Sequence, residues 1–275
     1  MSDSDDIFQK RVVLALPGME QVQARRNRIY KQVGDLELAY DVYYPLDFDE
    51  RESRPAVVFI HGEGPAEILK NAKDWGQYVS WGQLAAASGL VAVTFNHRSS
   101  EWFTKLYEVA SDVDDLMSHI RANAAALGID PARIGVWVCS GGTPVGLRMV
   151  LKAGANRIKC AAVYYGRTNL EMMRARIKSE ATDELLREFS PELLLRGMAG
   201  KDVPPLFMAR AGRDQLPMVN ETLDRFVALA IEKNAALDFL NHPEGEHAFD
   251  LLNADERSRQ IIGRTLRFLR ERLVK

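Results

Sequence analysis

The sequence has few of the features that would place it outside ordinary globular proteins. Only two cysteines, Cys139 and Cys160, occur in 275 residues, too few for a disulfide framework. The formal net charge is −2, so no excess of one sign attracts nucleic acid or anionic lipid. The 19 glycines and 11 prolines are too few for a fibrous or low-complexity chain. We therefore expect a globular protein that binds neither nucleic acid nor membranes.

Long apolar runs are also missing. No run approaches the roughly 18 residues that a membrane span needs. The first ten residues, MSDSDDIFQK, are acidic and lack the basic and apolar regions of a secretory signal. Both cysteines fall in apolar runs, as reduced and buried thiols do. These features predict a cytoplasmic protein and leave its oligomeric state open.

Short apolar runs alternate with helical periodicity from residue 55 onward. The runs are 56–60, 90–95, 134–139, 160–165, 206–209 and 237–240, and the helical segments are 75–88, 109–127, 143–153, 219–233 and 254–273. Continuous apolar runs are typical of strands buried on both faces, and their alternation with helices favours parallel strands. Before them, the stretches 28–33 and 36–44 flank a hairpin signal. The pattern predicts a doubly wound, mostly parallel α/β sheet with an N-terminal antiparallel hairpin.

The alternation continues to the end of the chain, so we expect a single domain over residues 1–275. Residues 1–10 are expected to form a loose tail. The stretch 167–203 is longer than one crossover helix needs and is rich in Met and Leu. It predicts a small, lid-like helical insertion, although a crossover with two helices would have the same pattern.

Side chains suited to catalysis follow several of the predicted strands. Functional groups of a parallel sheet gather in the loops that leave the carboxyl ends of its strands. These loops contain Ser140, Asp214 and His247, in that order along the chain. Ser140 ends a strand and is followed by Gly141, Gly142 and a helix. A sharp turn there would lift the Ser140 hydroxyl out of the sheet and aim the Gly141 N–H at the same point.

The segment Val138-Cys139-Ser140-Gly141-Gly142 resembles the nucleophile elbow G-x-S-x-G of the α/β-hydrolase family, with valine in place of the first glycine. More narrowly, the stretches RANAAALGIDPARIGVWVCSGG, ARAGRDQLP and HPEGEHAFD are similar to dienelactone-hydrolase-like and acetyl-esterase-like carboxylesterases. The resemblance runs from about residue 25 to the C-terminus. It implies an α/β-hydrolase fold and a serine hydrolase whose partner is a small carboxylic ester.

Within this resemblance, Ser140 is the nucleophile, His247 the general base and Asp214 the acid that orients the imidazole. The implied reaction passes through an acyl-serine intermediate. Two alternatives remain open. The same three residues would serve an acyltransferase or a peptidase, and a degenerate member would keep the fold as a binding protein.

The resemblance also implies two backbone donors for the oxyanion. One is the N–H of Gly141, and the other is the N–H of Glu63 or Gly62 in the loop after the third strand. Related loops carry glycine where Glu63 stands. A carboxylate would repel the oxyanion, so we expect the Glu63 side chain to point to solvent or to meet Arg98 or Arg167.

Other candidates for the same chemistry are weaker. Cys139 as nucleophile would place a tryptophan where the turn requires a small residue, so a buried thiol is expected. His242 is a second candidate base, but it precedes a proline at a strand end and favours a structural or pocket-lining role. His61 and His97 would line the site or cap strand ends, and no chemistry is expected of His119 within a helix.

Signatures of cofactor binding are missing as well. The sequence has no HExxH, CxxC or paired-histidine spacing, so we expect no metal site. The glycines at 62 and 64 are not continued into G-x-G-x-x-G, so no dinucleotide site is expected. We predict an enzyme without a cofactor.

Overall fold

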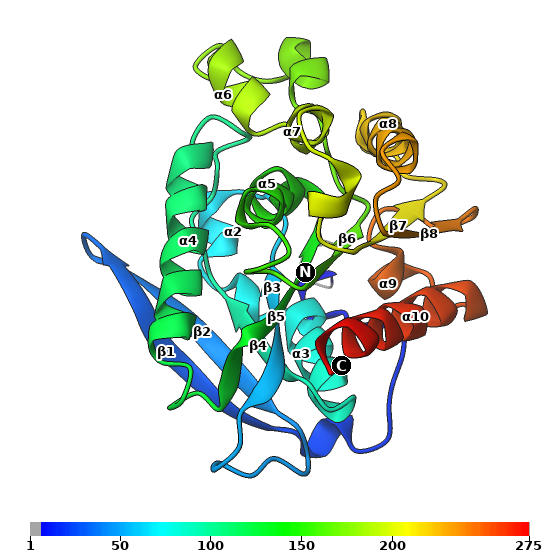
Figure 1. Ribbon diagram of the computed structural model, residues 1–275. Coiled ribbons are helices and arrows are strands. Elements are labelled where there is room, and N and C mark those ends of the chain that lie inside the picture. The colour runs from blue at the N-terminus through cyan, green and yellow to red at the C-terminus, as the bar shows by residue number, and fades with distance from the viewer. Residues whose placement is uncertain (1–6, 275) are drawn as a thin grey trace.

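The structure, a computed structural model, describes residues 7–274, and within them the chain forms an eight-stranded sheet in the order β1-β2-β4-β3-β5-β6-β7-β8 (Figure 1). The strands are β1 (Gln23–Val33), β2 (Leu36–Tyr44), β3 (Arg54–Ile60), β4 (Val91–Phe95), β5 (Ile129–Cys139), β6 (Cys160–Tyr164), β7 (Leu206–Ala211) and β8 (Leu237–His242). β2 runs antiparallel to β1 and β4, and the other neighbours are parallel. The predicted fold class is confirmed.

Helices cover both faces of the sheet (Figure 1). Helices α4 (Leu106–Ala122), α5 (Thr143–Ala153), α7 (Pro191–Arg196) and α8 (Val219–Glu232) lie on one face, and α3 (Gly76–Ala87) and α10 (Glu256–Leu273) lie on the other. Successive side chains of a strand point to opposite faces, so Val136 and Val138 of β5 enter one core while Trp137 and Cys139 enter the other. A strand between two cores must be apolar throughout, which explains the continuous runs in the sequence.

Two predicted boundaries shift. Helix α4 ends at Ala122, before the predicted residue 127, and the backbone N–H and the side-chain amide of Asn123 both donate to the His119 carbonyl, at 3.0 and 2.8 Å. Strand β5 begins at Ile129, where it pairs with Arg54 of β3, five residues before the predicted start at 134. Neither shift moves the carboxyl end of a strand, where the candidate residues lie.

The expected loose tail is partly wrong. Residues 1–6 lie outside the described residues, but residues 7–10 are packed against the start of α3. The Phe8 ring lies 4.5 Å from the Trp75 ring, and a Cβ on Gly76 would meet the backbone of this segment. Residues 7 and 8 are apolar and pack on the protein, but the acidic residues before them led to the prediction of a loose tail.

The stretch 167–203 is helical, as predicted. It forms η4 (Glu171–Arg176), α6 (Asp183–Glu188), α7 and η5 (Gly200–Asp202). Glu192 of α7 is buried and accepts hydrogen bonds from Asn169 at 2.9 Å and from Arg225 of α8 at 3.2 Å. The insertion is thus fixed to the helical layer on one face of the sheet.

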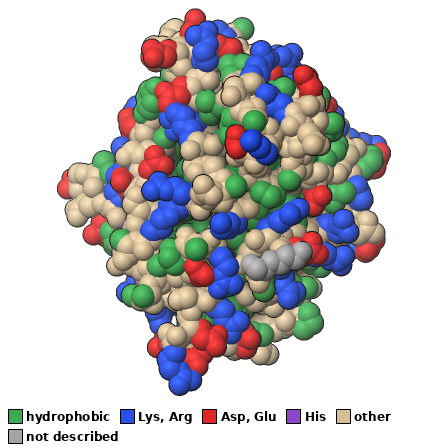
Figure 2. Space-filling view, viewed as in Figure 1, with side chains coloured by type: hydrophobic (Ala, Val, Ile, Leu, Met, Phe, Trp, Pro, Cys, Tyr) green, Lys and Arg blue, Asp and Glu red, His purple; other side chains and the backbone are tan. Residues whose placement is uncertain are grey.

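Charges of both signs are mixed on the molecular surface. On the face shown in Figure 2, Lys and Arg side chains are interspersed with Asp and Glu side chains. This mixture agrees with the small net charge of the chain. In residues 7–274, none of the helices combines the length and the apolar character needed to cross a bilayer.

Helix α5 lies unusually close to the sheet because Gly146 has no side chain. A Cβ on Gly146 would lie 2.9 Å from Val138 Cγ2 and 3.0 Å from Ile60 Cδ1. A Cβ on Gly142 would also contact Val138, at 3.4 Å. The valine that replaces the first glycine of the elbow pattern is thus accommodated by glycines on the facing helix.

This packing predicts a coupled effect on stability. Gly146→Ala is expected to lower the free energy of unfolding by about 1–2 kcal/mol, because overpacking outweighs the gain in helix propensity. Adding Val138→Ala should remove the clash, so the double variant should lose less stability than the sum of the single changes. Urea unfolding of the four proteins measures this coupling, and strictly additive losses would contradict the proposed contact.

Candidate active site

Ser140 occupies the sharp turn between β5 and α5. Its φ is +50°, in the left-handed region that residues other than glycine seldom adopt. The turn passes directly under the loop after β3, since a Cβ on Gly142 would lie 2.2 Å from the carbonyl oxygen of His61. Position 142 therefore requires glycine. The turn leaves the Ser140 side chain half-buried at the carboxyl edge of the sheet.

The structure brings Ser140, His247 and Asp214 together in one hydrogen-bonded row. Ser140 Oγ lies 2.8 Å from His247 Nε2, and His247 Nδ1 lies 2.6 Å from Asp214 Oδ2. A carboxylate only accepts, so Nδ1 carries the ring proton and Nε2 accepts from the serine hydroxyl. The Asp214 side chain is fully buried, and its other oxygen accepts from the Leu216 N–H at 2.9 Å. These bonds fix the orientation of the imidazole.

A buried tyrosine supports the histidine and was not foreseen from the sequence. The Tyr165 ring, at the end of β6, lies 4.6 Å from the His247 ring. Its hydroxyl donates to Asp250 at 2.7 Å, and the same carboxylate accepts from Trp81 and Gln77. Burial raises the pKa of Asp250, although these donors oppose the shift. In the sequence, only the position of Tyr165 at the end of a predicted strand indicates that it lies near the catalytic residues.

Two backbone N–H groups lie next to Ser140. A Cβ on Gly141 would lie 3.1 Å from the nitrogen of Glu63, so these two backbone segments are in contact. The N–H of Gly62 donates to the Tyr78 hydroxyl at 3.1 Å and is therefore occupied. Among residues 7–274, the Glu63 N–H has no hydrogen-bond acceptor. Of the two donors predicted in this loop, the one at Glu63 is free and the one at Gly62 is not.

The Glu63 carboxylate meets neither Arg98 nor Arg167, so this expectation is wrong. Its two oxygens instead bind Ser99 Oγ at 2.7 Å and the Ser100 N–H at 3.1 Å. The serines lie in the loop after β4 and hold the carboxylate within the protein. Two serines therefore replace the ion pair that we expected.

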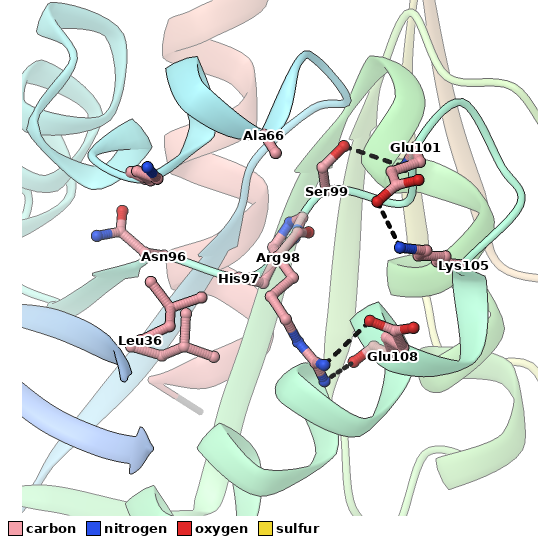
Figure 3. A pocket seen from close by; sticks show the side chains of 11 residues that line it. Leu36, Ala66, Asn96, His97, Arg98, Ser99, Glu101, Lys105 and Glu108 are labelled. Atoms are coloured by element: carbon pink, nitrogen blue, oxygen red, sulfur yellow. Dashed lines mark hydrogen bonds and ion pairs between the residues drawn. The ribbon is translucent and has the colours of Figure 1, made fainter. Parts of the chain in front are cut away.

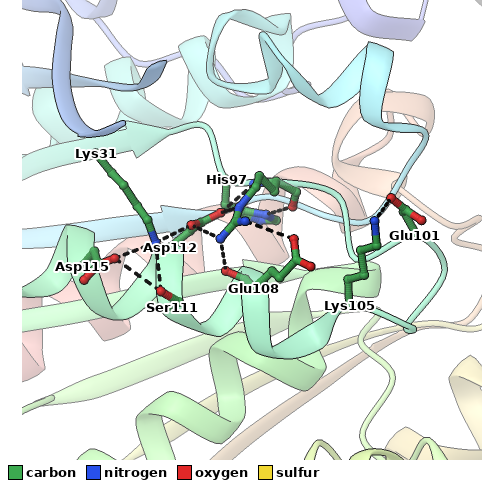
Figure 4. A network of polar contacts seen from close by, with 9 residues as sticks. Lys31, His97, Glu101, Lys105, Glu108, Ser111, Asp112 and Asp115 are labelled. Carbon is green, nitrogen blue, oxygen red and sulfur yellow. Dashed lines mark hydrogen bonds and ion pairs between the residues drawn. The ribbon is translucent and has the colours of Figure 1, made fainter. Parts of the chain in front are cut away.

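Arg98 is engaged elsewhere, in a network with the buried Asp112 (Figure 4). Its Nε and Nη2 lie 2.9 Å from the two oxygens of Asp112, and its Nη1 lies 3.0 Å from Glu108. Lys31 reaches Asp112 from β1 at 2.8 Å. Burial alone would raise the pKa of Asp112, but the hydrogen bonds from Arg98 and Lys31 outweigh it and lower the pKa. The network anchors the loop that carries Ser99.

Arg167 is also buried, directly after β6. Its guanidinium lies over the Phe103 ring, with 5.9 Å from Cζ to the ring centroid. Burial lowers its pKa, and the nearby Asp214 opposes this shift.

A pocket of about 200 Å³ opens at Ser140. Its lining comprises Ile7, Phe8, Gly62, Glu63, Trp75, Gln77, Tyr78, Cys139, Ser140, Tyr165, His247, Ala248 and Leu251. Most of these side chains are apolar or aromatic. The stretch 167–203 contributes none of them, so the structure gives no support to the predicted lid role at this pocket.

A second pocket, of about 250 Å³, lies beyond the Glu63–Ser99 contact (Figure 3). Its charged side chains are all engaged in ion pairs: Lys105 pairs with Glu101, and Arg98 pairs with Glu108. Lys70 pairs with Glu67 outside the lining. It contains His97 but neither the serine nor the aspartate of the hydrogen-bonded row. The groups suited to acyl chemistry thus face the first pocket.

The remaining candidates have structural surroundings. Burial raises the pKa of the Cys139 thiol to about 12, which leaves it protonated at neutral pH. His242 Nε2 lies 3.0 Å from Ser258 Oγ and 3.2 Å from the Asp255 carboxylate. The rings of His61 and His97 stack with their centroids 3.5 Å apart. His119 Nε2 lies 3.0 Å from the Tyr40 hydroxyl. In the described part of the chain, no three His, Cys, Asp or Glu side chains are grouped as metal ligands would be.

The Asp112 network predicts a pH-dependent contribution to stability. Asp112→Asn should lower the free energy of unfolding by about 3 kcal/mol at pH 7, because Arg98 would lose its buried charged partner. The folded-state pKa is lowered, so this stabilisation is complete above the ordinary aspartate pKa and is lost as the pH falls through the folded value. The difference between wild type and variant should therefore narrow below about pH 4.

Asp115→Asn is the matched control, because Asp115 lies on the same helix and binds the same Lys31 but is half exposed. Its loss should remain below about 1 kcal/mol. Urea unfolding at pH 7 and pH 3 gives both comparisons. Equal losses in the free energy of unfolding for the two variants at pH 7 would show that the buried Asp112 stabilises the fold no more than the half-exposed Asp115.

The comparisons with known proteins agree with this arrangement. The BD-FAE family model, which describes α/β-hydrolase esterases, matches residues 40–185, just over half of the chain. The structure is similar to that of Thermogutta terrifontis esterase 2 phosphorylated by paraoxon, with a TM-score of 0.71 at 18% identity over 94% of this chain and 95% of that one. The butyrate-bound form of the same esterase gives a TM-score of 0.70 at 19% identity over 93% and 95%.

The similarity to the solved structures establishes the fold, and the family match establishes the class of enzyme. The β3–β5 core that carries the elbow lies inside the matched range. Asp214 and His247 lie beyond it, in the loops that follow β7 and β8, the last two strands of the same sheet. The chain belongs to the BD-FAE family of α/β-hydrolase esterases and is a carboxylic ester hydrolase.

Proposed function

We propose that the chain hydrolyses small carboxylic esters through an acyl-Ser140 intermediate. The observation that carries this proposal is the continuous row Ser140–His247–Asp214, with distances of 2.8 Å and 2.6 Å, beside two adjacent backbone N–H groups. This is the arrangement that acyl transfer to a serine requires. The pocket at Ser140 is small and largely apolar, which suits a small ester.

In the proposed reaction, Ser140 Oγ attacks the acyl carbon while His247 Nε2 accepts the hydroxyl proton. The negative charge that forms on the carbonyl oxygen is held by the N–H groups of Gly141 and Glu63. The alcohol leaves with the proton from His247, and the acyl group stays on Ser140. Water, deprotonated by His247, then attacks the acyl-serine and releases the acid. Asp214 stabilises the imidazolium in both halves of the reaction.

Two observations favour an active member of the family over a degenerate one. Val138 fits the elbow because Gly146 on the facing helix leaves space for it. The Glu63 carboxylate is bound by Ser99 and Ser100, so its charge is held by hydrogen-bond donors of the loop after β4. Both departures from the family pattern are therefore compatible with catalysis.

The similar esterase supports the covalent step. Thermogutta terrifontis esterase 2 is phosphorylated by paraoxon and has also been captured with propionate and butyrate. Reaction with an organophosphate requires an activated nucleophile, and the two acids are short. We infer the same kind of nucleophile and a similar substrate size for this chain.

Replacing the nucleophile tests the proposal. Ser140→Ala should lower kcat/KM for p-nitrophenyl acetate by about 10⁴–10⁶-fold, because no other group can form the acyl-enzyme. The same change should abolish covalent labelling by a fluorophosphonate. Cys139→Ala is the matched control for the neighbouring thiol and should keep the label. Hydrolysis that persists in Ser140→Ala, or a label that disappears only with Cys139, would refute the assignment.

The second substrate is tested separately. With p-nitrophenyl acetate, the wild-type acyl-enzyme should yield acetate even when alcohols, amines or thiols are added in millimolar amounts. Product analysis by chromatography measures the partition. Predominant transfer of the acetyl group to an added acceptor would make the enzyme an acyltransferase with the same catalytic residues.

A further inference from the structure

The chain N-terminal to the sheet runs across the active-site side of the molecule. Residues 7–16, called here the N-terminal strap, start beside α3 and α9 (Phe249–Leu252) in Figure 1. They precede the first strand and belong to no part of the sheet. The family model begins at residue 40, so the strap also lies outside the matched range.

The strap is held by specific contacts along its length. The Val12 N–H donates to the buried hydroxyl of Ser80 on α3 at 2.9 Å. The Val13 N–H donates to the Asp250 carbonyl on α9 at 2.8 Å. The Val12 side chain is itself buried in the core. The strap thus joins α3 to the short helix that follows His247.

Gly76, the first residue of α3, permits the strap to approach the helix. A Cβ on Gly76 would lie 2.4 Å from the Gln9 carbonyl oxygen and 2.5 Å from that of Lys10. These neighbours are backbone atoms, which cannot rotate out of the way as the end of a side chain can. Any larger residue at position 76 must therefore displace this part of the strap.

The first two described residues of the strap form a wall of the active-site pocket. Ile7 and Phe8 line the same cavity as Ser140 and His247. The Phe8 ring packs against Trp75, and Trp75 lies 6.1 Å from the Tyr78 ring. The wall is therefore a row of aromatic rings that begins with the strap.

The size of the pocket restricts what the closed wall admits. Its volume is about 200 Å³. Typical small-molecule pockets hold about 300–1,000 Å³, and an apolar cavity of about 150 Å³ accommodates a single benzene ring. The pocket at Ser140 therefore suits an apolar group of about six carbon atoms, such as a short alkyl chain or one ring.

We propose that the N-terminal strap is a specificity element that limits the apolar side of the ester to short chains, with Phe8 as the closing residue and Gly76 as its docking position. The inference rests on the proposed function of Ser140, because it concerns the same pocket. It assigns to the strap a role in substrate selection that residues of the sheet do not perform. Displacing the strap should lengthen the pocket without touching the catalytic row.

Two variants of the full chain displace the strap by different means. Phe8→Ala removes the closing ring. Gly76→Ala places a Cβ against the strap backbone, and alanine has a higher helix propensity than glycine. Gly263→Ala is the matched control, since it adds a Cβ to a helix at a position with nothing within 4 Å. Circular dichroism and thermal unfolding confirm that each variant is folded before its activity is compared.

The readout is kcat/KM over two ester series. One series varies the acyl chain of p-nitrophenyl esters from acetate to decanoate, and the other varies the alkyl chain of acetates from ethyl to octyl. Wild type should lose activity beyond about six carbons in the series whose variable group enters the pocket. In that series, we compare kcat/KM for the eight-carbon ester with kcat/KM for the two-carbon ester. Both strap variants should raise this ratio about tenfold, because two additional methylenes become buried. Gly263→Ala should keep the wild-type ratio.

The outcomes separate the strap from the chemistry. Unchanged ratios in both series, or an equal loss on all esters, would overturn the specificity role and leave the strap as a structural segment. Wild type that hydrolyses no ester and takes no fluorophosphonate label would instead refute the proposed function. A wider chain-length range in both strap variants, with the acetate rate largely retained, supports the proposal.

Discussion

The crossing of two backbone segments, residues 61–63 and 140–142, is the constraint on which the active site depends. β3 and β5 are parallel neighbours, so the loops that follow them leave the sheet at the same edge. The two loops are so close that side chains on Gly141 or Gly142 would collide with the other loop. This contact places the turn that carries Ser140 next to the free backbone nitrogen of Glu63 in the facing loop. The same closeness explains why α5 needs a further glycine against the sheet.

The site uses neutral groups to control charge near the reacting oxygen. The Glu63 carboxylate accepts hydrogen bonds from the Ser99 hydroxyl and the Ser100 N–H. Arg98 instead binds Asp112 on α4. His61 and His97 lie in the same region, and burial lowers the pKa of both imidazoles. The oxyanion loop is therefore supported by uncharged histidines and serines. Under the proposed function, the Glu63 N–H would act on the oxyanion while the Glu63 carboxylate is held in place by Ser99 and Ser100.

The fold and the meeting of Ser140, His247 and Asp214 in one hydrogen-bonded row could be predicted because each depends on simple rules. Strands buried on both faces are continuously apolar, and loops after parallel strands converge, so Ser140, Asp214 and His247 could be placed together. The partners of Glu63 could not be predicted, because Ser99 and Ser100 depend on the path of a loop that continues through positive φ at residues 101–103. The space for Val138 could not be predicted because it is created by Gly146 on the facing helix α5. The strap was missed because its partners at the start of α3 are some 70 residues away in the sequence and resemble an ordinary helix start.

The link between Val13 and Asp250 has a consequence for the order in which the enzyme matures. The strap is the first described part of the chain to be synthesised, yet the carbonyl that binds it belongs to α9, near the other end. Contacts between residues so distant in sequence form slowly, because a long loop must close first. During synthesis, the contacts of the strap with α3 can therefore form before its hydrogen bond to Asp250. The strap thus joins an early and a late part of the described chain beside the active-site pocket.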